Sequence, residues 1–433
     1  MQDVQDSVIG STAVTEQSTA EMTQFLVRHN YTTPETHLPV WSRTTGGPIS
    51  QRFLWHFFVV GFLKKFLCFE PQEVGHQSSF EDPFLVLFPQ LALTSPCLLA
   101  AVLSFSLQQY AAYRGTQTIS ISPDYYSSQA IQALTKRELG SMQPKMLLSI
   151  IATGVFLHLG EQDRKQNCLE LARSAAAYLA DIASSTPLAS SQEYQLIMAL
   201  LRWADISTLC SLQVRTTPVT KGIHRSIQLR QHEVHENFSR VFSHWVTHPI
   251  FGFSAHLVNP LLELGRLLQL QLRCFSSIGN DGGSFDVDEA AQATALEDDI
   301  LTASGNFHTW CQSKDLNDLQ PLVHLNAAMH ASTELLFYSR LRGFPFTAPL
   351  IRSYVRQILD HVLQVPQNSP AFGALLFPLC VAGCEAVDED LRAVVVLKVL
   401  LLHQGTEQPE MLVRMLKQLT KNTELLYGFE ADS

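Results

Sequence analysis

Helix-start and helix-stop residues recur at the ends of apolar segments, and this pattern constrains the fold more than any other feature of the sequence. Ser95-Pro96 opens the segment LLAAVLSFSLQQYAAYR, and Gly115 follows it. Serine caps first-turn amides, proline fits the first helical turn, and glycine ends a helix at low steric cost. The same order occurs twice more, at Ser122-Pro123 with Gly140 and at Gln143-Pro144 with Gly160. The pattern predicts three consecutive helices.

Helical periodicity predicts further helices, at residues 51–69, 162–184, 191–212, 254–275, 287–304, 318–342, 347–364, 371–386, 388–404 and 407–426. No segment alternates apolar and polar residues between turn pairs, so no sheet is predicted. Two zones, 213–252 and 276–285, lack helical signals, and SSIGNDGGS in the second is typical of a flexible loop. We therefore predict an all-α fold, in which one large domain of packed antiparallel helices, partly solenoid-like but without a fixed repeat period, covers residues 50–429.

The first 49 residues differ from the rest of the chain. They are rich in Ser, Thr and Gln, which predicts a disordered polar tail over residues 1–49. The first 20 residues have neither a basic region nor an apolar core, so they do not form a secretory signal. Apolar runs further along are too short or too interrupted to cross a bilayer, and we expect buried helices and no membrane contact.

The distribution of charge and of cysteine residues bears on whether the chain binds DNA or zinc and whether it forms disulfides. The formal net charge is −10, and basic residues are dispersed, with short pairs such as Lys64-Lys65 and Lys136-Arg137. An acidic chain without a basic cluster repels a phosphate backbone, so no direct DNA binding is expected. The eight cysteines are scattered and contain no Cys-x-x-Cys pair. This spacing disfavours a zinc module and a disulfide framework, and it indicates a reducing compartment.

A search for catalytic patterns finds none, so we predict no enzyme site, no cofactor and no metal. His244 and His248 have helical spacing, but Trp245 stands where a zinc protease needs glutamate. Gly252-Phe-Ser-Ala-His256 lacks the second glycine of a nucleophile elbow, and Ser254 is better explained as a helix N-cap. Phosphate-binding glycine motifs are absent from the sequence.

Two further polar groups have ordinary structural interpretations. His324 and His330 are six residues apart and do not share a helix face. We expect His330 to lie among core residues with its ring nitrogens bonded to local groups. Glu297, Asp298 and Asp299 are consecutive residues of a predicted helix. Their carboxylates therefore point to different sides, and we expect a solvated face.

Several segments, in a fixed order, resemble one known family. Near the C-terminus, LLFPLCVAGCEA at residues 375–386, with Arg392 after it and LQVP at 363–366 before it, is similar to the signature of the fungal-specific transcription factor domain. Further upstream, AAMHASTELLFYSR at 327–340 is similar to another helix of that family. In the first half, FLWH at 53–56, DPF at 82–84, SPCLLAA at 95–101 and residues 126–134 agree as well. The resemblance covers residues 50–428.

The resemblance implies the helical regulatory region that follows a two-zinc, six-cysteine DNA-binding module. That module requires closely spaced cysteines with basic neighbours, and Cys68 is the first cysteine of this sequence. The expectation is a nuclear regulator or co-regulator without its own zinc cluster. It would control a metabolic or secondary-metabolite gene set by pairing with other transcription regulators, such as a zinc-cluster factor. The alternatives are a helical small-molecule sensor, a scaffold with no role at promoters, an enzyme of unfamiliar type, or a degenerate or truncated gene product.

The family-signature positions are expected to be structural. Gly383 allows two helices to approach closely or kinks one of them. Glu385 lies in an apolar segment, so its burial requires a partner, for which Arg340 and Arg392 are the candidates. We favour a structural ion pair over an effector contact. The signature set is Pro378, Gly383, Cys384, Glu385, Ala386, Arg340 and Arg392.

Overall fold

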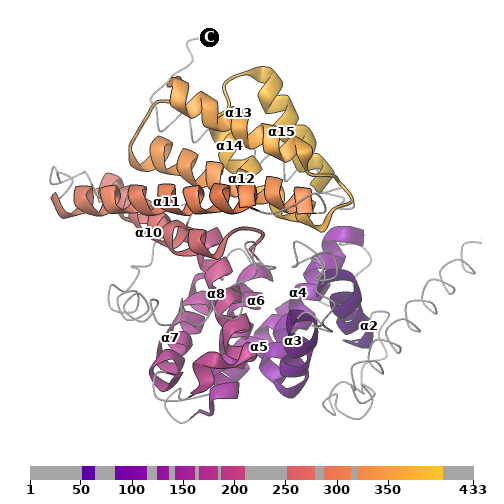
Figure 1. The fold of residues 1–433 in the computed structure, drawn as a ribbon. Coiled ribbons are helices and arrows are strands. Elements are labelled where there is room, and N and C mark those ends of the chain that lie inside the picture. Colours follow the sequence, from indigo (N-terminus) through magenta and orange to yellow (C-terminus); the bar gives the residue numbers. More distant parts are fainter. Residues whose placement is uncertain are drawn as a thin grey trace, which may run out of the picture.

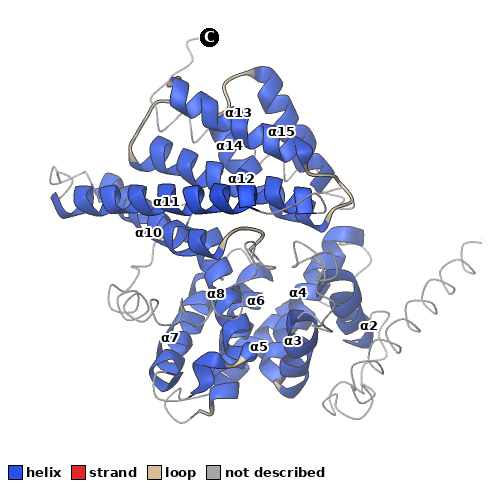
Figure 2. Cartoon of the chain, viewed as in Figure 1, coloured by secondary structure: helices blue, strands red, loops and turns tan. Residues whose placement is uncertain are grey.

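The computed structural model describes residues 51–63, 83–114, 124–135, 142–160, 165–183, 187–209, 251–277, 287–313 and 319–402. Every regular element in these residues is a helix, which confirms the all-α prediction (Figure 2). The predicted tail at 1–49, the predicted helix at 407–426 and nearly all of the irregular zone 213–252 lie outside the described residues.

The first half of the chain forms one group of helices. Its elements are α2 (Gln51–His56), the π-helical η2 (Phe57–Phe62), α3 (Pro83–Thr94), α4 (Pro96–Arg114), α5 (Asp124–Thr135), α6 (Pro144–Gly160), α7 (Lys165–Ala183), the 3-10 turn η7 (Pro187–Ser190) and α8 (Gln192–Leu209). Helix α6 lies at the centre, where it packs against α4, α7 and α8. Its residues from Leu147 to His158 are all buried. A helix that is apolar on every face requires neighbours on every side.

The second half forms the other group. Its elements are α10 (Ala255–Ser277), α11 (Val287–Ser313), α12 (Gln320–Leu336), the π-helical η9 (Phe337–Leu341), α13 (Pro349–Gln364), the 3-10 turn η10 (Pro370–Leu375), α14 (Leu376–Glu385) and α15 (Glu389–Leu402). In Figure 1, α10 and α11 lie across the molecule between the first group below and α12–α15 above. Helix α10 packs on α8, and this contact joins the groups. The larger buried core includes residues of both, from Leu54 to Val399.

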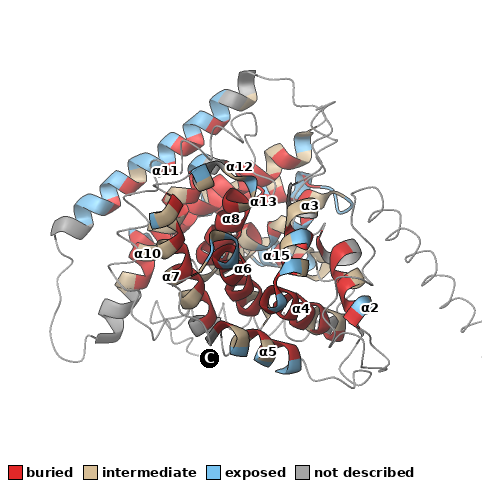
Figure 3. Ribbon diagram, turned by 90° about the horizontal axis from the view of Figure 1, so that it is seen from below, coloured by how far each residue is buried: buried red, intermediate tan, exposed pale blue. Residues whose placement is uncertain are grey.

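Burial separates the central helices from the outer ones. Figure 3 shows α4, α6 and α8 as largely buried, whereas α11 runs along the outside with one exposed face. That helix buries Leu296, Ile300 and Phe307 and exposes Leu301 and His308. Among the described residues no single helix has the length and apolar character of a membrane span. Only α3 and α4 together meet that criterion, as the segments Val86–Thr94 and Pro96–Ala111 at 115° to each other.

Several helix boundaries differ from the predictions. Helix α3 was not predicted, and it contains Pro89, a residue that disfavours a helix interior. The predicted helix 318–342 changes to a π-helix at Phe337, where the Arg342 amide donates to the Phe337 carbonyl. The predicted helix 371–386 starts with a 3-10 segment. Helix α10 extends to Ser277, into the predicted loop at 276–285, and α11 extends past residue 304 to Ser313.

Candidate functional site

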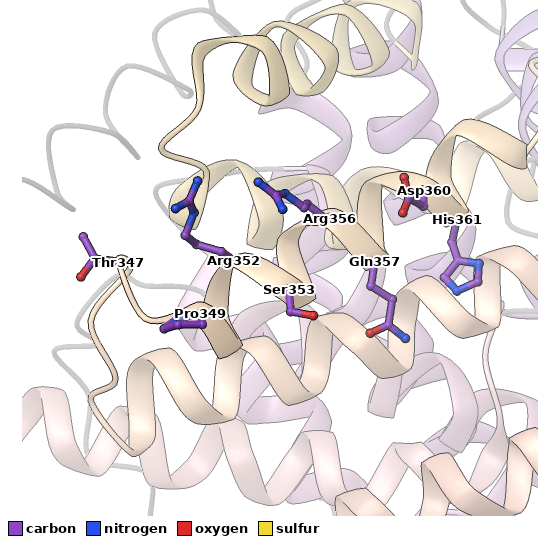
Figure 4. Close-up of a pocket in the computed structure, with 8 residues that line it drawn as sticks. All are labelled: Thr347, Pro349, Arg352, Ser353, Arg356, Gln357, Asp360 and His361. Atoms are coloured by element: carbon purple, nitrogen blue, oxygen red, sulfur yellow. The ribbon is translucent and has the colours of Figure 1, made fainter.

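Helix α13 has one apolar and one polar face. The apolar face buries Ile351, Val355, Ile358, Leu359 and Val362. The polar face lines a surface hollow of about 680 Å³, and the described residues around it are Thr347, Pro349, Arg352, Ser353, Arg356, Gln357, Asp360 and His361. Figure 4 shows that all eight lie on α13 or just before it, with Thr347 and Pro349 at its start. No role was predicted for this face, because a row of charged residues is typical of any solvated helix.

Two arginines dominate the hollow. Arg352 and Arg356 are one helical turn apart, and Figure 4 shows both side chains directed to the same side of α13. Both contact Asp388, which lies between α14 and α15, at 3.3 Å and 3.7 Å. The three side chains are 46 %, 61 % and 40 % exposed. Ion pairs with this much exposure contribute little to stability. Because both arginine side chains are about half exposed, their guanidinium groups are accessible to solutes.

His361, at the far end of the hollow, pairs with a histidine of α12. His361 of α13 and His324 of α12 place their Nδ1 atoms 3.0 Å apart, so one ring donates and the other accepts. Burial lowers the pKa of both imidazoles, and for His361 the neighbouring His324 adds to the effect. From the sequence, the neighbour considered for His324 was His330, on the same helix. The true partner is 37 residues away, and only the packing of α12 on α13 brings the rings together.

The family-signature residues surround a buried ion pair. A guanidinium nitrogen of Arg340 lies 2.7 Å from Oε1 of Glu385, and the two side chains are 8 % and 1 % exposed. Burial raises the pKa of Glu385, while Arg340 and the hydroxyl of Ser339 act in the opposite direction. Arg392, the other candidate partner, instead donates from Nε to the carbonyl of Ala386 at 2.6 Å. The two arginines therefore hold consecutive residues at the end of α14, one by its side chain and the other by its backbone.

The remaining signature residues lie where α14 meets its neighbours. A β-carbon on Gly383 would lie 3.0 Å from Cγ1 of Val395, so the glycine marks the close approach of α14 to α15. Pro378 is buried, and the amide of Ala386 closes α14 by donating to the Ala382 carbonyl. Burial raises the pKa of Cys384 to about 12, so it is a thiol at neutral pH and a poor nucleophile.

His330 is buried as predicted, but the predicted hydrogen bonds are wrong. Its side chain is 2 % exposed and stacks on Phe307, with ring centroids 5.2 Å apart. Among the residues that the structure describes, neither ring nitrogen has a hydrogen-bond partner. Burial, with smaller contributions from His308 and His256, lowers the pKa of His330 to about 3. The imidazole is therefore neutral at physiological pH.

Glu297 also differs from its prediction. Asp298 and Asp299 are exposed, but Glu297 is half-buried and joins α11 to the C-terminal helices. It accepts hydrogen bonds from the hydroxyl of Tyr338 at 2.9 Å and from Arg342 at 2.5 Å. Burial and this carboxylate raise the pKa of Tyr338 to about 12. Of the three adjacent acids, only Glu297 is on the side of α11 that faces the protein.

The other predicted positions are ordinary in geometry. Ser254 Oγ accepts from the His256 amide at 3.2 Å, which is the geometry of an N-cap for α10. In the part of the chain that the structure describes, no three His, Cys, Asp or Glu side chains come together as metal ligands. His244 and His248 lie outside that part. The described residues therefore offer a polar face on α13 and a buried ion pair between η9 and the end of α14.

Comparison with known families identifies the domain. The model for the fungal specific transcription factor domain matches residues 52–421, which is most of the chain. The chain belongs to this family. Membership assigns it to the fungal transcription regulators and implies a regulator rather than an enzyme. No curated protein and no solved structure matches the chain.

Proposed function

We propose that this chain is a co-regulator that reaches promoters through protein partners. The observation that carries the proposal is the regulatory-domain match over residues 52–421 in a sequence without a six-cysteine cluster. The net charge of −10 also disfavours contact with a phosphate backbone. In this proposal a second protein recognises DNA. A zinc-cluster factor is the partner class that family analogy favours.

The same analogy favours nuclear localisation and a metabolic or secondary-metabolite gene set as the target. The buried pair of Arg340 and Glu385 supports a structural role for the signature, because both side chains are inaccessible to a large ligand. Contacts with partners then fall to exposed residues. A fluorescent fusion of the full chain that stays out of the nucleus under inducing conditions would contradict the localisation.

Chromatin immunoprecipitation tests recruitment directly. The tagged full chain is mapped on the genome of its host in a wild-type strain and in strains that each lack one zinc-cluster factor. We expect discrete promoter occupancy that disappears in one deletion strain. A mobility-shift assay with the purified chain and an occupied promoter is the matched control. Occupancy that persists in every deletion strain, together with a specific shift by the chain alone, would overturn the proposal.

A second candidate function is the sensing of a small molecule. The hollow on α13 favours it, because its volume of about 680 Å³ is in the usual range for small-ligand sites. A ligand of the native state raises the unfolding midpoint, so thermal-shift measurements against a metabolite panel provide the test. A flat response across charged and neutral compounds would count against sensing and would leave recruitment by partners untouched.

A further inference from the structure

We propose that the hollow on α13 binds a small multivalent anion, a metabolite with several carboxylate or phosphate groups, through Arg352 and Arg356. This inference rests on the sensing function proposed above and names its ligand class. The lining contains two guanidinium groups, one hydroxyl side chain on each side of Pro349, and the Gln357 amide, whereas Pro349 is its main apolar residue. Such a surface is suited to oxygen-rich anions rather than to hydrophobic compounds.

The arrangement of the arginines supports this ligand class. A guanidinium group presents parallel N–H donors that match the two oxygens of a carboxylate or phosphate. Side chains four residues apart on a helix lie next to each other, so Arg352 and Arg356 can hold two anionic groups of one molecule. Ser353 and Gln357 also line the hollow, but Figure 4 shows their side chains directed to the other side of α13, so the two arginines are the groups that hold the anion. Asp360 disfavours an anion at the opposite end, which places the ligand over the first two turns.

The start of α13 adds a favourable field. Ala348 is the N-cap residue and has no side-chain oxygen to accept from the first-turn amides. The N-terminus of a helix carries partial positive charge and favours anions nearby. Thr347 and Pro349 lie at this end of the hollow, so the helix dipole and the two arginines act on the same volume (Figure 4).

Asp388 shows that the arginine pair accepts a carboxylate, and also that it holds this one loosely. Four arginine–carboxylate pairs elsewhere in the described residues have nitrogen–oxygen distances of 2.5–2.7 Å: Arg173–Asp205, Arg266–Glu263, Arg340–Glu385 and Arg342–Glu297. Asp388 lies at 3.3 Å and 3.7 Å, beyond the range of a strong charge-assisted hydrogen bond. The carboxylate of Asp388 therefore acts as an internal competitor that a better-placed anion displaces.

Displacement of Asp388 links the hollow to α15. Asp388 directly precedes Glu389, the first residue of α15, and its carbonyl accepts from the Arg392 amide. Aspartate at this position is a favourable N-cap. An anion that takes over Arg352 and Arg356 frees the Asp388 carboxylate to accept from first-turn amides of α15. Ligand binding then changes the connection between α14 and α15 without moving the buried pair at Glu385.

Isothermal titration of the full chain with citrate and with pyrophosphate, at constant ionic strength, tests the proposal and separates the carboxylate and phosphate classes. We expect saturable one-site binding of at least one probe. The Arg352→Ala/Arg356→Ala variant should bind about tenfold more weakly or not at all, because charge-assisted hydrogen bonds are lost. Arg266→Ala removes an arginine that pairs with Glu263 on another helix, and this variant should bind the probe as the wild type does.

Asp388→Asn gives the sharper result, because it should tighten binding by about twofold to fivefold, the range for losing one competing surface ion pair. Asp299→Asn makes the same change in net charge on exposed α11 and should leave affinity unchanged. Circular dichroism melts of each variant establish that it is folded. Equal tightening by both substitutions, or wild-type binding by the double arginine variant, would overturn the site. If either result is obtained while promoter occupancy is intact, the anion site is wrong and the proposed recruitment by protein partners is unaffected.

Discussion

Replacement of His330 by leucine should make stability less sensitive to acid. Burial lowers the pKa of His330 to about 3, whereas an exposed histidine has a pKa of 6.5. The unfolded chain therefore binds a proton first as pH falls. The stability held by neutral His330 is complete above about pH 6.5 and is lost progressively as pH falls toward 3.

The size of this loss follows from the two pKa values. Between pH 7.5 and pH 5.0, proton uptake by the unfolded chain alone costs the folded state about 2 kcal/mol. A folded-state pKa of 4 instead of 3 gives nearly the same figure, because the site is neutral at pH 5 in both cases. At pH 7.5, leucine removes two buried nitrogens that lack partners, each costing about 1–3 kcal/mol, and loses a stacking contact of about 0.5–1.5 kcal/mol. We therefore expect His330→Leu to be more stable than the wild type at this pH, by at least about 0.5 kcal/mol.

Urea unfolding followed by circular dichroism at pH 7.5 and pH 5.0 measures both effects. The wild type should lose about 2 kcal/mol more than His330→Leu over this interval. His308→Gln, which removes an exposed neighbouring imidazole on α11, is the control and should retain most of the wild-type loss. An equal loss in His330→Leu and the wild type would refute the reasoning, as would an NMR titration that places the His330 pKa near 6.5.

Four further substitutions test the packing. Arg340→Leu should destabilise the chain by about 3–5 kcal/mol, because it leaves Glu385 buried without its cation, and adding Glu385→Leu should recover much of that loss in a denaturant-based double-mutant cycle. Gly154→Ala should lower the melting temperature, because its β-carbon would lie 2.5 Å from the Cys168 carbonyl oxygen. Gly305→Ala, which meets nothing within 4 Å on α11, should raise stability by about 0.5–1 kcal/mol, and the reverse order of melting temperatures would contradict this reasoning. The His324–His361 pair should titrate below pH 6.5 by NMR, and the stability it contributes should be present above that pH and decline as the rings take up protons.

The helices were predictable where local signals are complete. Pro96 and Pro144 are the first residues of α4 and α6, as Ser95-Pro96 and Gln143-Pro144 predicted. Such starts are predictable because capping and first-turn preferences depend only on neighbouring residues. Helix α3 was not predicted, and the cost of Pro89 inside it can be offset by tertiary packing that local sequence does not contain. The change to a π-helix at Phe337 was hidden for the same reason. Local sequence therefore identified most helices and missed the irregularities within them.

The candidate site was predictable only in part. Burial of Glu385 implied an arginine partner, but the choice between Arg340 and Arg392 depends on how α12, η9 and α14 cross. The same limit applies to His324, since its partner is on another helix. The distance of Asp388 from Arg352 has no sequence signature, because a short loop can bring a carboxylate to 2.7 Å or to 3.3 Å of an arginine.

Glu385 and Asp388 differ in how firmly they are held, and this difference allows one short segment to contain both a fixed contact and a contact that a ligand can displace. Glu385 and Asp388 are three residues apart, yet the first is held at 2.7 Å by Arg340 and is 1 % exposed, and the second lies 3.3 Å from Arg352 and is 40 % exposed. A ligand can shift an equilibrium only through contacts that differ between its two states. The buried pair is common to both states of the proposed site, whereas the Asp388 contact is lost when an anion binds. The end of α14 therefore serves as the fixed support, and Asp388 as the group whose exchange reports the ligand to α15.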